Sequence, residues 1–254
     1  MRIASYNILD GGEGRADPLA EVLLAQRADV VALLEADDAA VVRRIASRMN
    51  MDFIEAKSRK HTVALLSRWR IAETINHAAL RAKSEMSLLE ATVIEPGGRE
   101  WPVGVVHLSP YAREADEQQR ERELPLVLDA FASHRQQNRP HLLVGDFNAN
   151  APYQQIDPQR CKESTRRAWE ENGNQVPRRV VQRLLDEGYL DTLRVVNRSA
   201  SETSGSFSTQ NPGQRVDYIF AWGVDPAAIG EAWIEHDRLA KYASDHFPVG
   251  AKIA

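Results

Sequence analysis

Short apolar runs that recur along the chain are the feature that most restricts its fold. Nine of them are rich in leucine, β-branched and aromatic residues, and each is six to nine residues long. Several are apolar almost without interruption, which is typical of strands covered on both faces. In chain order they read "RIASYNI", "DVVALLEA", "VALLSRW", "SLLEATVIE", "WPVGVVHL", "HLLVGDF", "RVDYIFAW", "EAWIEH" and "FPVGAKI". The chain is therefore expected to form many short strands in sheets that lie between other layers.

Helical patterns lie between these runs, but they lack the strict alternation of a doubly wound fold. A helix start is indicated at Asp17-Pro18, because proline is favoured in the first turn of a helix. A second helix is expected after Asp37, which we predict to be its cap. The pattern as a whole predicts an α/β fold, a four-layered sandwich of two packed, mostly antiparallel sheets with helices outside.

Two later helices and two long loops complete the prediction. Helices are expected at residues 114–135 and 178–187, and Pro125 should kink or restart the first of them. Residues 151–176 are polar, and residues 199–214 are rich in Ser, Thr and Gly, so both are predicted to be loops. Long loops in a compact domain are often functional or mobile.

Composition limits the architecture further. A chain of 254 residues with 43% hydrophobic content can form one large core, so a single domain over residues 1–254 is expected, and we expect a monomer. No apolar run approaches the roughly 20 residues that span a bilayer. The first residues lack an apolar signal-peptide core, which favours a cytoplasmic location. The single cysteine, Cys161, excludes an internal disulfide and is interpreted as a packing or surface residue.

Polar side chains repeatedly follow the predicted strands. Acids, amides and histidines occur at or just beyond strand ends, and one acid falls inside a strand pattern. These residues are Asn7, Glu35, His107, Asp146, Asn148, Asp217, Asp245 and His246. If they converge, they form an oxygen-rich site with two histidines, which suits Mg²⁺ or Mn²⁺ better than a metal that prefers thiolate ligands.

Each of these residues has a simpler explanation when it is taken alone. Asp146 and Asn148 are common turn formers, Glu35 is compatible with a surface acid, and a single histidine such as His107 is more often a satisfied core group. Asp217 is harder to dismiss, because burying an unpaired carboxylate within "RVDYIFAW" costs several kcal/mol. A histidine partner, His246, would solve that problem. The occurrence of all these residues in one chain argues for a common site.

Six segments resemble the successive motifs of the endonuclease/exonuclease/phosphatase superfamily. They are "SYNI", "LLEA", "VVHLSP", "GDFNA", "RVDYIF" and "SDHFPV". The resemblance extends from residue 3 to about residue 250, and residues 151–176 have no counterpart in it. It implies a four-layered α/β sandwich with an active site at one rim of the sheets. It also implies Mg²⁺- or Mn²⁺-dependent cleavage of phosphate esters.

The resemblance also implies a role for each residue. Glu35 resembles the principal metal ligand, with Asn7 and Asp245 close to the metal. Asp146 and Asn148 resemble residues that orient or activate water and hold the phosphate. The remaining residues are the Asp–His pair, Asp217 and His246, and the second histidine, His107. Either Asp146 or His246 would deprotonate the attacking water, and the sequence leaves both open.

His107 separates this chain from one branch of the superfamily. Abasic-site endonucleases usually have a tyrosine motif where this chain has "VVHLSP", so the chain is more similar here to pancreatic-type deoxyribonucleases, sphingomyelinases and related phosphodiesterases. In the pancreatic-type enzymes a glutamate on an earlier strand supports the histidine, and "KSEMSLLEA" offers Glu85 in a similar place. Secreted relatives carry a signal peptide and often disulfides. This sequence shows neither an apolar signal-peptide core nor a second cysteine, which argues against an extracellular digestive role.

The charge of the chain leaves the substrate open. The formal net charge is −4 and the pI is about 6.0, which does not support a large non-specific nucleic-acid surface. Residues 160–183, however, contain seven Lys/Arg and three acids. We expect a phosphodiesterase, foremost a nuclease acting on DNA or RNA. The alternatives are a phosphatase or phosphodiesterase of a small or lipid phosphate, and a catalytically inactive binding module.

Overall fold

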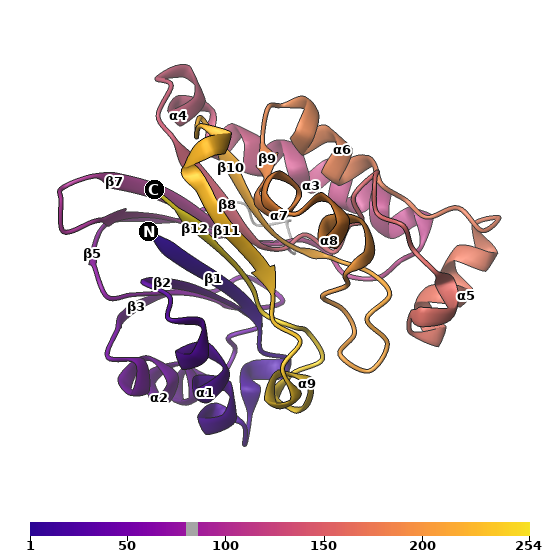
Figure 1. The fold of residues 1–254 in the computed structure, drawn as a ribbon, viewed down its shortest axis with the longest axis horizontal. Helices are drawn as coiled ribbons and strands as arrows, with labels where there is room; N and C mark the ends of the chain where they lie inside the picture. The colour runs from indigo at the N-terminus through magenta and orange to yellow at the C-terminus, as the bar shows by residue number, and fades with distance from the viewer. Residues whose placement is uncertain (80–85) are drawn as a thin grey trace.

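A computed structural model describes residues 1–79 and 86–254, and it contains two sheets packed face to face (Figure 1). Within the described residues, each sheet has six strands. The first sheet has the order β11 (Ile229–Ile234), β12 (Val249–Ile253), β1 (Arg2–Asn7), β2 (Val30–Leu34), β4 (Val63–Ser67), β3 (Asp52–Ala56). The second has the order β5 (Arg70–Asn76), β6 (Ser87–Ile94), β7 (Glu100–His107), β8 (His141–Asp146), β10 (Asp217–Trp222), β9 (Leu190–Asp191).

Each sheet contains one parallel pair at its centre, β1–β2 in the first and β7–β8 in the second, and the other described pairs are antiparallel. All nine strands predicted from the apolar runs are present. The sequence missed β3 and β5, whose exposed and charged positions interrupt the apolar pattern, and β9, which is only two residues long.

Three apolar clusters define four layers. Side chains from both sheets, such as Ile3, Val103 and Val144, fill the space between the sheets. The helices α1 (Ala16–Gln26), α2 (Ala39–Met49) and α9 (Arg238–Ala243) cover the outer face of the first sheet. The helices α3 (Glu114–Ala130), α4 (Ala132–Gln136) and α6 (Arg179–Asp186) lie over the second (Figure 1). The predicted α/β four-layered sandwich is therefore confirmed.

The remaining described helices lie away from these two layers. Helix α7 (Thr192–Val196) packs against β10 and β11, and α8 (Arg198–Thr203) follows it directly. Helix α5 (Glu163–Glu171) stands apart from both sheets at one end of the molecule (Figure 1). Short 3₁₀ turns occur at η1 (Asp10–Gly12), η2 (Pro158–Arg160) and η3 (Pro226–Ala228).

Three helix predictions need correction. Helix α1 begins at Ala16, so Pro18 is its third residue and not its first. The backbone N–H groups of the first four residues of a helix have no partner within it, so proline loses no hydrogen bond at this position. Helix α3 continues through Pro125 and ends at Ala130. Pro125 has no N–H to donate to the carbonyl oxygen four residues earlier. Because this side of the helix is exposed at Pro125, water can bind that oxygen instead. The break comes instead at Phe131, a fully buried residue between α3 and α4.

The predicted cap of α2 is also wrong by one residue. Asp38 is the cap, and its carboxylate accepts from Ala40 N at 2.7 Å. Asp37 instead accepts from the backbone N of Thr62 at 2.6 Å and contacts His61 Nδ1 at 2.8 Å. Two adjacent acids cannot be ranked from sequence, because a long-range partner decides which of them is left to cap the helix.

The two segments predicted to be loops both contain helix. Residues 151–176 include η2 and α5, and residues 199–214 overlap α8. Only Thr165 and Trp169 of α5 are buried, so its apolar stripe is too narrow to be recognised. Within the described residues, no helix combines the length and the apolar composition needed to cross a membrane.

Candidate active site

The strand directions bring the predicted residues to one rim of the two sheets. β1 and β2 run parallel, as do β7 and β8, so Asn7, Glu35, His107 and Asp146 all lie at the carboxyl ends of central strands. β10 runs antiparallel to β8, and its first residue, Asp217, pairs directly with Asp146. Asp217 therefore begins its strand and does not lie within it, which corrects the expectation from the sequence.

Asn7 joins the two sheets at this rim. Its Nδ2 donates to Glu35 Oε1 at 3.0 Å and to Asp146 Oδ2 at 3.2 Å, while its Oδ1 accepts from Leu9 N at 3.0 Å. The second oxygen of Glu35 accepts from Asp10 N at 2.9 Å. Asn7 thus fixes the spacing between two carboxylates that belong to different sheets.

Gly145 allows Asp146 to reach its position. Its φ is +141°, and a Cβ there would lie 2.0 Å from the carbonyl oxygen of Val106, so a larger residue would push β8 away from β7. Beyond Asp146, the chain turns back. Asn148 N donates to Asp146 Oδ1 at 2.8 Å, and Asn148 Nδ2 donates to Leu108 O at 3.0 Å.

Two histidines face the same carboxylate oxygen. His107 Nε2 lies 3.8 Å from Asp146 Oδ2, and His246 Nε2 lies 3.7 Å from it. The other ring nitrogen of His246, Nδ1, is 2.9 Å from Asp217 Oδ2, so the Asp–His hydrogen bond predicted from the sequence is present. All four side chains are buried.

Burial and mutual charge shift the pKa values of this group in different directions. Burial raises the pKa of the Asp146 carboxyl to about 7, and the negative charge of Asp217 acts in the same direction. Burial alone would lower the pKa of His246, but the carboxylates of Asp217 and Asp146 outweigh it and raise this pKa to about 10. Burial lowers the pKa of His107 to about 3, and the charges of His61 and His246 add to this effect. In the absence of a bound cation, His246 is therefore the charged histidine and His107 the neutral one.

The residues at the rim fit a hard cation, and they offer two positions for it. Among the described residues, ligand atoms of Asp146, Asp217 and His246 lie within 4.8 Å of one another. The resemblance predicts the other position, at Glu35 with Asn7 and Asp245. Buried carboxylate oxygens without a hydrogen-bond partner among the described residues occur at both positions, namely Asp217 Oδ1 and Asp245 Oδ1. Oxygen donors of this kind suit Mg²⁺ or Mn²⁺.

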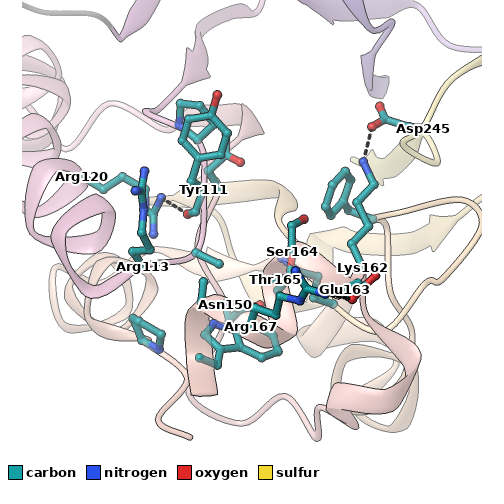
Figure 2. Close-up of a pocket in the computed structure, with 18 of the residues that line it drawn as sticks. Tyr111, Arg113, Arg120, Asn150, Lys162, Glu163, Ser164, Thr165, Arg167 and Asp245 are labelled. Carbon is teal, nitrogen blue, oxygen red and sulfur yellow. Dashed lines mark hydrogen bonds and ion pairs between the residues drawn. The ribbon is translucent and has the colours of Figure 1, made fainter. Parts of the chain in front are cut away.

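A pocket of about 680 Å³ opens above these residues. Glu35, Asn148, Asp245 and His246 line it together with α5, so part of the 151–176 segment lies beside the site. Figure 2 shows the Lys162–Asp245 ion pair on one side of the pocket and Tyr111 with Arg113 on the other.

Several residues around the site were not predicted from the sequence. Lys162 Nζ lies 2.9 Å from Asp245 Oδ2 and 4.3 Å from the ring centre of Phe207, and the Phe207 ring lies 4.7 Å from that of His246. The sequence around them contains no motif that signals these contacts. Glu85, the predicted support for His107, lies outside the described residues.

Cys161 is a buried packing residue, one of the two roles expected from the sequence. Its side chain is 6% exposed, and burial raises the pKa of its thiol to about 11. The thiolate that a nucleophile requires is therefore not formed near neutral pH.

The fold and the rim together define a class of protein, a four-layered sandwich with acids, amides and histidines gathered at one edge of its two sheets. The chain matches the model of the Endonuclease/Exonuclease/phosphatase family over residues 4–246, and it belongs to that family. Members of this family are metal-dependent phosphoesterases, so the chain is a metal-dependent phosphoric ester hydrolase.

Solved structures share the fold across the whole chain. An AP endonuclease from Archaeoglobus fulgidus superposes with a TM-score of 0.75 at 16% identity, covering 100% of this chain and 99% of that one. The 3′ phosphatase NExo from Neisseria, bound to a product DNA hairpin, superposes with a TM-score of 0.71 at 22% identity, covering 100% of this chain and 99% of that one. The catalytic domain of human Nocturnin with bound sulfate superposes with a TM-score of 0.73 at 16% identity, covering 100% of this chain and 94% of that one. No curated protein matched the sequence. At these identities the likeness shows the fold alone.

Proposed function

We propose that this protein is a Mg²⁺- or Mn²⁺-dependent phosphodiesterase that cleaves nucleic acid. The observation that carries the proposal is the arrangement around Asp146. Two histidine Nε2 atoms lie 3.8 and 3.7 Å from its Oδ2, one of them on an imidazole that Asp217 holds, and Glu35 and Asp245 line the adjoining pocket. An inactive binding module has no need to keep this whole set.

The cation would be held by Glu35 with Asp245 and Asn7. We prefer this position because Glu35 and Asp245 line the open pocket, whereas Asp146 and Asp217 are not among the residues that line it. When bound, the cation supplies positive charge that neutralises a phosphate oxygen and the leaving oxygen.

The residues of the chain supply the remaining steps. Asp146 orients the water and accepts its proton, because its Oδ2 lies where Asn7 and both histidines converge. His246 points Nε2 toward the phosphate, since Nδ1 is committed to Asp217, and it stabilises the negative charge that develops there. Asn148 is held by its neighbours with its amide at the wall of the pocket and contributes to phosphate binding.

Nucleic acid is favoured as the substrate by the walls of the pocket. Lys162, Arg113 and Arg167 line it, and positive side chains around a phosphodiester site neutralise the phosphates on either side of the bond. Two of the structures with the same fold are an AP endonuclease and a phosphatase bound to a DNA hairpin.

The net charge of −4 favours a second candidate, a phosphatase or phosphodiesterase of a small or lipid phosphate. Glu163 and Glu171 also line the pocket, so its wall is of mixed charge. The chemistry at Asp146 and His246 would be the same, and only the group attached to the phosphate would differ.

A substrate panel separates these candidates. The purified protein is tested on single-stranded DNA and RNA, duplex DNA, a chromogenic phosphodiester, and small and lipid phosphates, each with Mg²⁺ and with a chelator. We expect metal-dependent cleavage of nucleic acid and of the chromogenic diester, lost in Asp146→Asn and kept in the control Asp52→Asn, an exposed acid on β3. Turnover of small or lipid phosphates alone would support the second candidate, and the absence of any turnover would contradict both.

A further inference from the structure

Tyr111 has a conformation and an exposure that the stability of the fold does not require. Its side chain is 66% exposed, and it lines the pocket beside the candidate active site. Its backbone φ is +79°, in the left-handed region that residues with a Cβ adopt only at an energetic cost. A bulky aromatic residue that packs little against the core and strains its own backbone contributes little to folding.

The backbone of the loop that carries Tyr111 is nevertheless fixed by hydrogen bonds to buried side chains of α3. Arg120 is 2% exposed, and its Nη1 donates to the carbonyl oxygens of Tyr111 at 2.8 Å and of Ser109 at 2.9 Å. Glu123 accepts from Ser109 N at 2.9 Å and from Ser109 Oγ at 2.6 Å. Two buried charged residues of α3 thus fix the backbone on which the tyrosine stands.

This support is itself anchored to a second helix. Arg120 Nη2 lies 3.0 Å from Glu117 Oε2, and Glu117 Oε1 accepts from the backbone N of Arg179 at 2.8 Å and of Val180 at 3.1 Å, at the start of α6. The strained conformation is therefore imposed by a network that links α3, α6 and the loop after β7. Strained residues that their surroundings hold in place cluster at active sites, ligand clamps and switch regions.

The surroundings of the ring indicate what that ligand is. Lys60 Nζ lies 5.4 Å from the ring centre and Arg113 Cζ lies 5.9 Å from it, so two exposed cations lie close to the ring. Figure 2 shows Tyr111 across the pocket from the Lys162–Asp245 ion pair. A flat aromatic surface flanked by positive charge suits a base whose attached phosphates are negative.

We propose that Tyr111 is a stacking platform for an unpaired base of the substrate, while its phosphates are neutralised by Lys60 and Arg113. This inference rests on the proposed function and makes the substrate class narrower. The base must present a free face to the ring, so it belongs to a single strand or to an unpaired end. The backbone support from Arg120 presents the ring at a fixed distance from the candidate active site.

The test compares oligonucleotides that differ in one base. A single-stranded oligonucleotide is prepared as a series in which one nucleotide at a time is replaced by an abasic residue, and kcat/KM is measured with Mg²⁺. For the wild type we expect a loss of about tenfold when the base at one particular position near the cleaved bond is missing, because stacking on an aromatic residue has that magnitude. Tyr111→Ala should lower kcat/KM on the intact strand about tenfold and abolish the dependence on that position. Tyr111→Phe should retain both.

A chromogenic phosphodiester distinguishes the failure of this inference from that of the proposed function. Tyr111→Ala should turn it over within twofold of the wild type, since no base reaches the ring. If the wild type cleaves no nucleic acid, the proposed function fails. If it cleaves nucleic acid and Tyr111→Ala responds to the abasic series as the wild type does, only the stacking role is wrong.

A second variant separates binding from folding. Glycine adopts positive φ freely, so Tyr111→Gly should keep its melting temperature within about 2 °C of the wild type while losing cleavage as Tyr111→Ala does. Melting temperatures that fall by many degrees in both variants would show that Tyr111 is a structural residue and would overturn the proposal.

Discussion

The hydrogen bond between Asp217 and His246 makes the sharpest prediction about the site. Asp217 is 1% exposed and His246 is 5% exposed, and their 2.9 Å contact is the bond that fixes the imidazole. We expect Asp217→Asn and His246→Ala each to lower kcat at least ~10²-fold, the lower end for removing a donor that stabilises developing negative charge. The double variant should lose little more than the worse single variant, because the two residues act as one unit.

The size of the expected coupling follows from that arrangement. A ~10²-fold loss corresponds to about 2.7 kcal/mol of activation free energy. Independent residues would lose ~10⁴-fold together, about 5.4 kcal/mol, so the two outcomes differ by about 2.7 kcal/mol. Against the effect of burial, Asp217 is the first of three carboxylates, with Asp146 and Asp245, that raise the pKa of His246 to about 10. Removing it therefore weakens both the charge of His246 and the aim of its Nε2.

The assay is kcat on a chromogenic phosphodiester at saturating Mg²⁺, with folding followed by thermal melting. His246→Ala is expected to lower the melting temperature as well, because Asp217 is left buried without its partner. Asp52→Asn serves as the control for an exposed acid. Fully multiplicative losses of kcat in a folded double variant would refute the pairing.

Three further predictions concern other parts of the molecule. Burial lowers the pKa of His141 to about 4 from 6.5, so between these pH values the unfolded chain binds a proton that the folded chain does not. About 3 kcal/mol of the free energy of unfolding should therefore be lost as the pH falls from 6.5 to 4. A melting temperature that depends on pH as strongly in His141→Gln as in the wild type would contradict this. Asp191→Asn leaves the buried Arg215 without its counter-charge and should cost about 3–5 kcal/mol in urea unfolding, whereas a cost below 1 kcal/mol would mean that the pair is dispensable. Lys162→Met removes the ammonium group that lies 2.9 Å from Asp245 Oδ2 and competes with a metal for that carboxylate. We therefore expect calorimetry to show Mn²⁺ binding up to about fivefold more tightly to the variant than to the wild type. Weaker binding would show that Lys162 does not compete with the metal.

Much of the fold could be predicted because its strands are short, apolar and almost continuous. Runs such as that ending at Asp146 can only be buried on both faces, and two sheets with helices outside satisfy that requirement. The errors lie where tertiary contacts decide between local alternatives. Asp37 was predicted to cap α2 but does not, because it contacts His61 and Thr62. Helix α5 was missed because only two of its residues are buried.

The candidate site divides in the same way. Residues at the ends of strands could be predicted to converge, since parallel strands bring Glu35 and Asp146 to one rim, and the burial of Asp217 required a partner. Tyr111 and Lys162 could not be predicted, because they lie on loops whose approach to the rim is set by contacts with distant elements. Tyr111 directly follows the "VVHLSP" segment, but that segment predicts the role of His107 and not the exposure of the tyrosine.

The Mg²⁺ dependence of oligonucleotide cleavage decides whether the protein is a nuclease that uses a cation held by Glu35. The rate on a single-stranded oligonucleotide is measured against Mg²⁺ concentration for the wild type, Glu35→Gln and Asp52→Asn. We predict that a chelator abolishes cleavage, that Glu35→Gln raises the Mg²⁺ concentration for half-maximal rate by at least about tenfold, and that Asp52→Asn matches the wild type, because Glu35 lines the pocket and Asp52 is exposed on β3. Cleavage that persists in the chelator would show that the reaction needs no divalent cation, and an Mg²⁺ titration that Glu35→Gln leaves unchanged would show that Glu35 does not hold it.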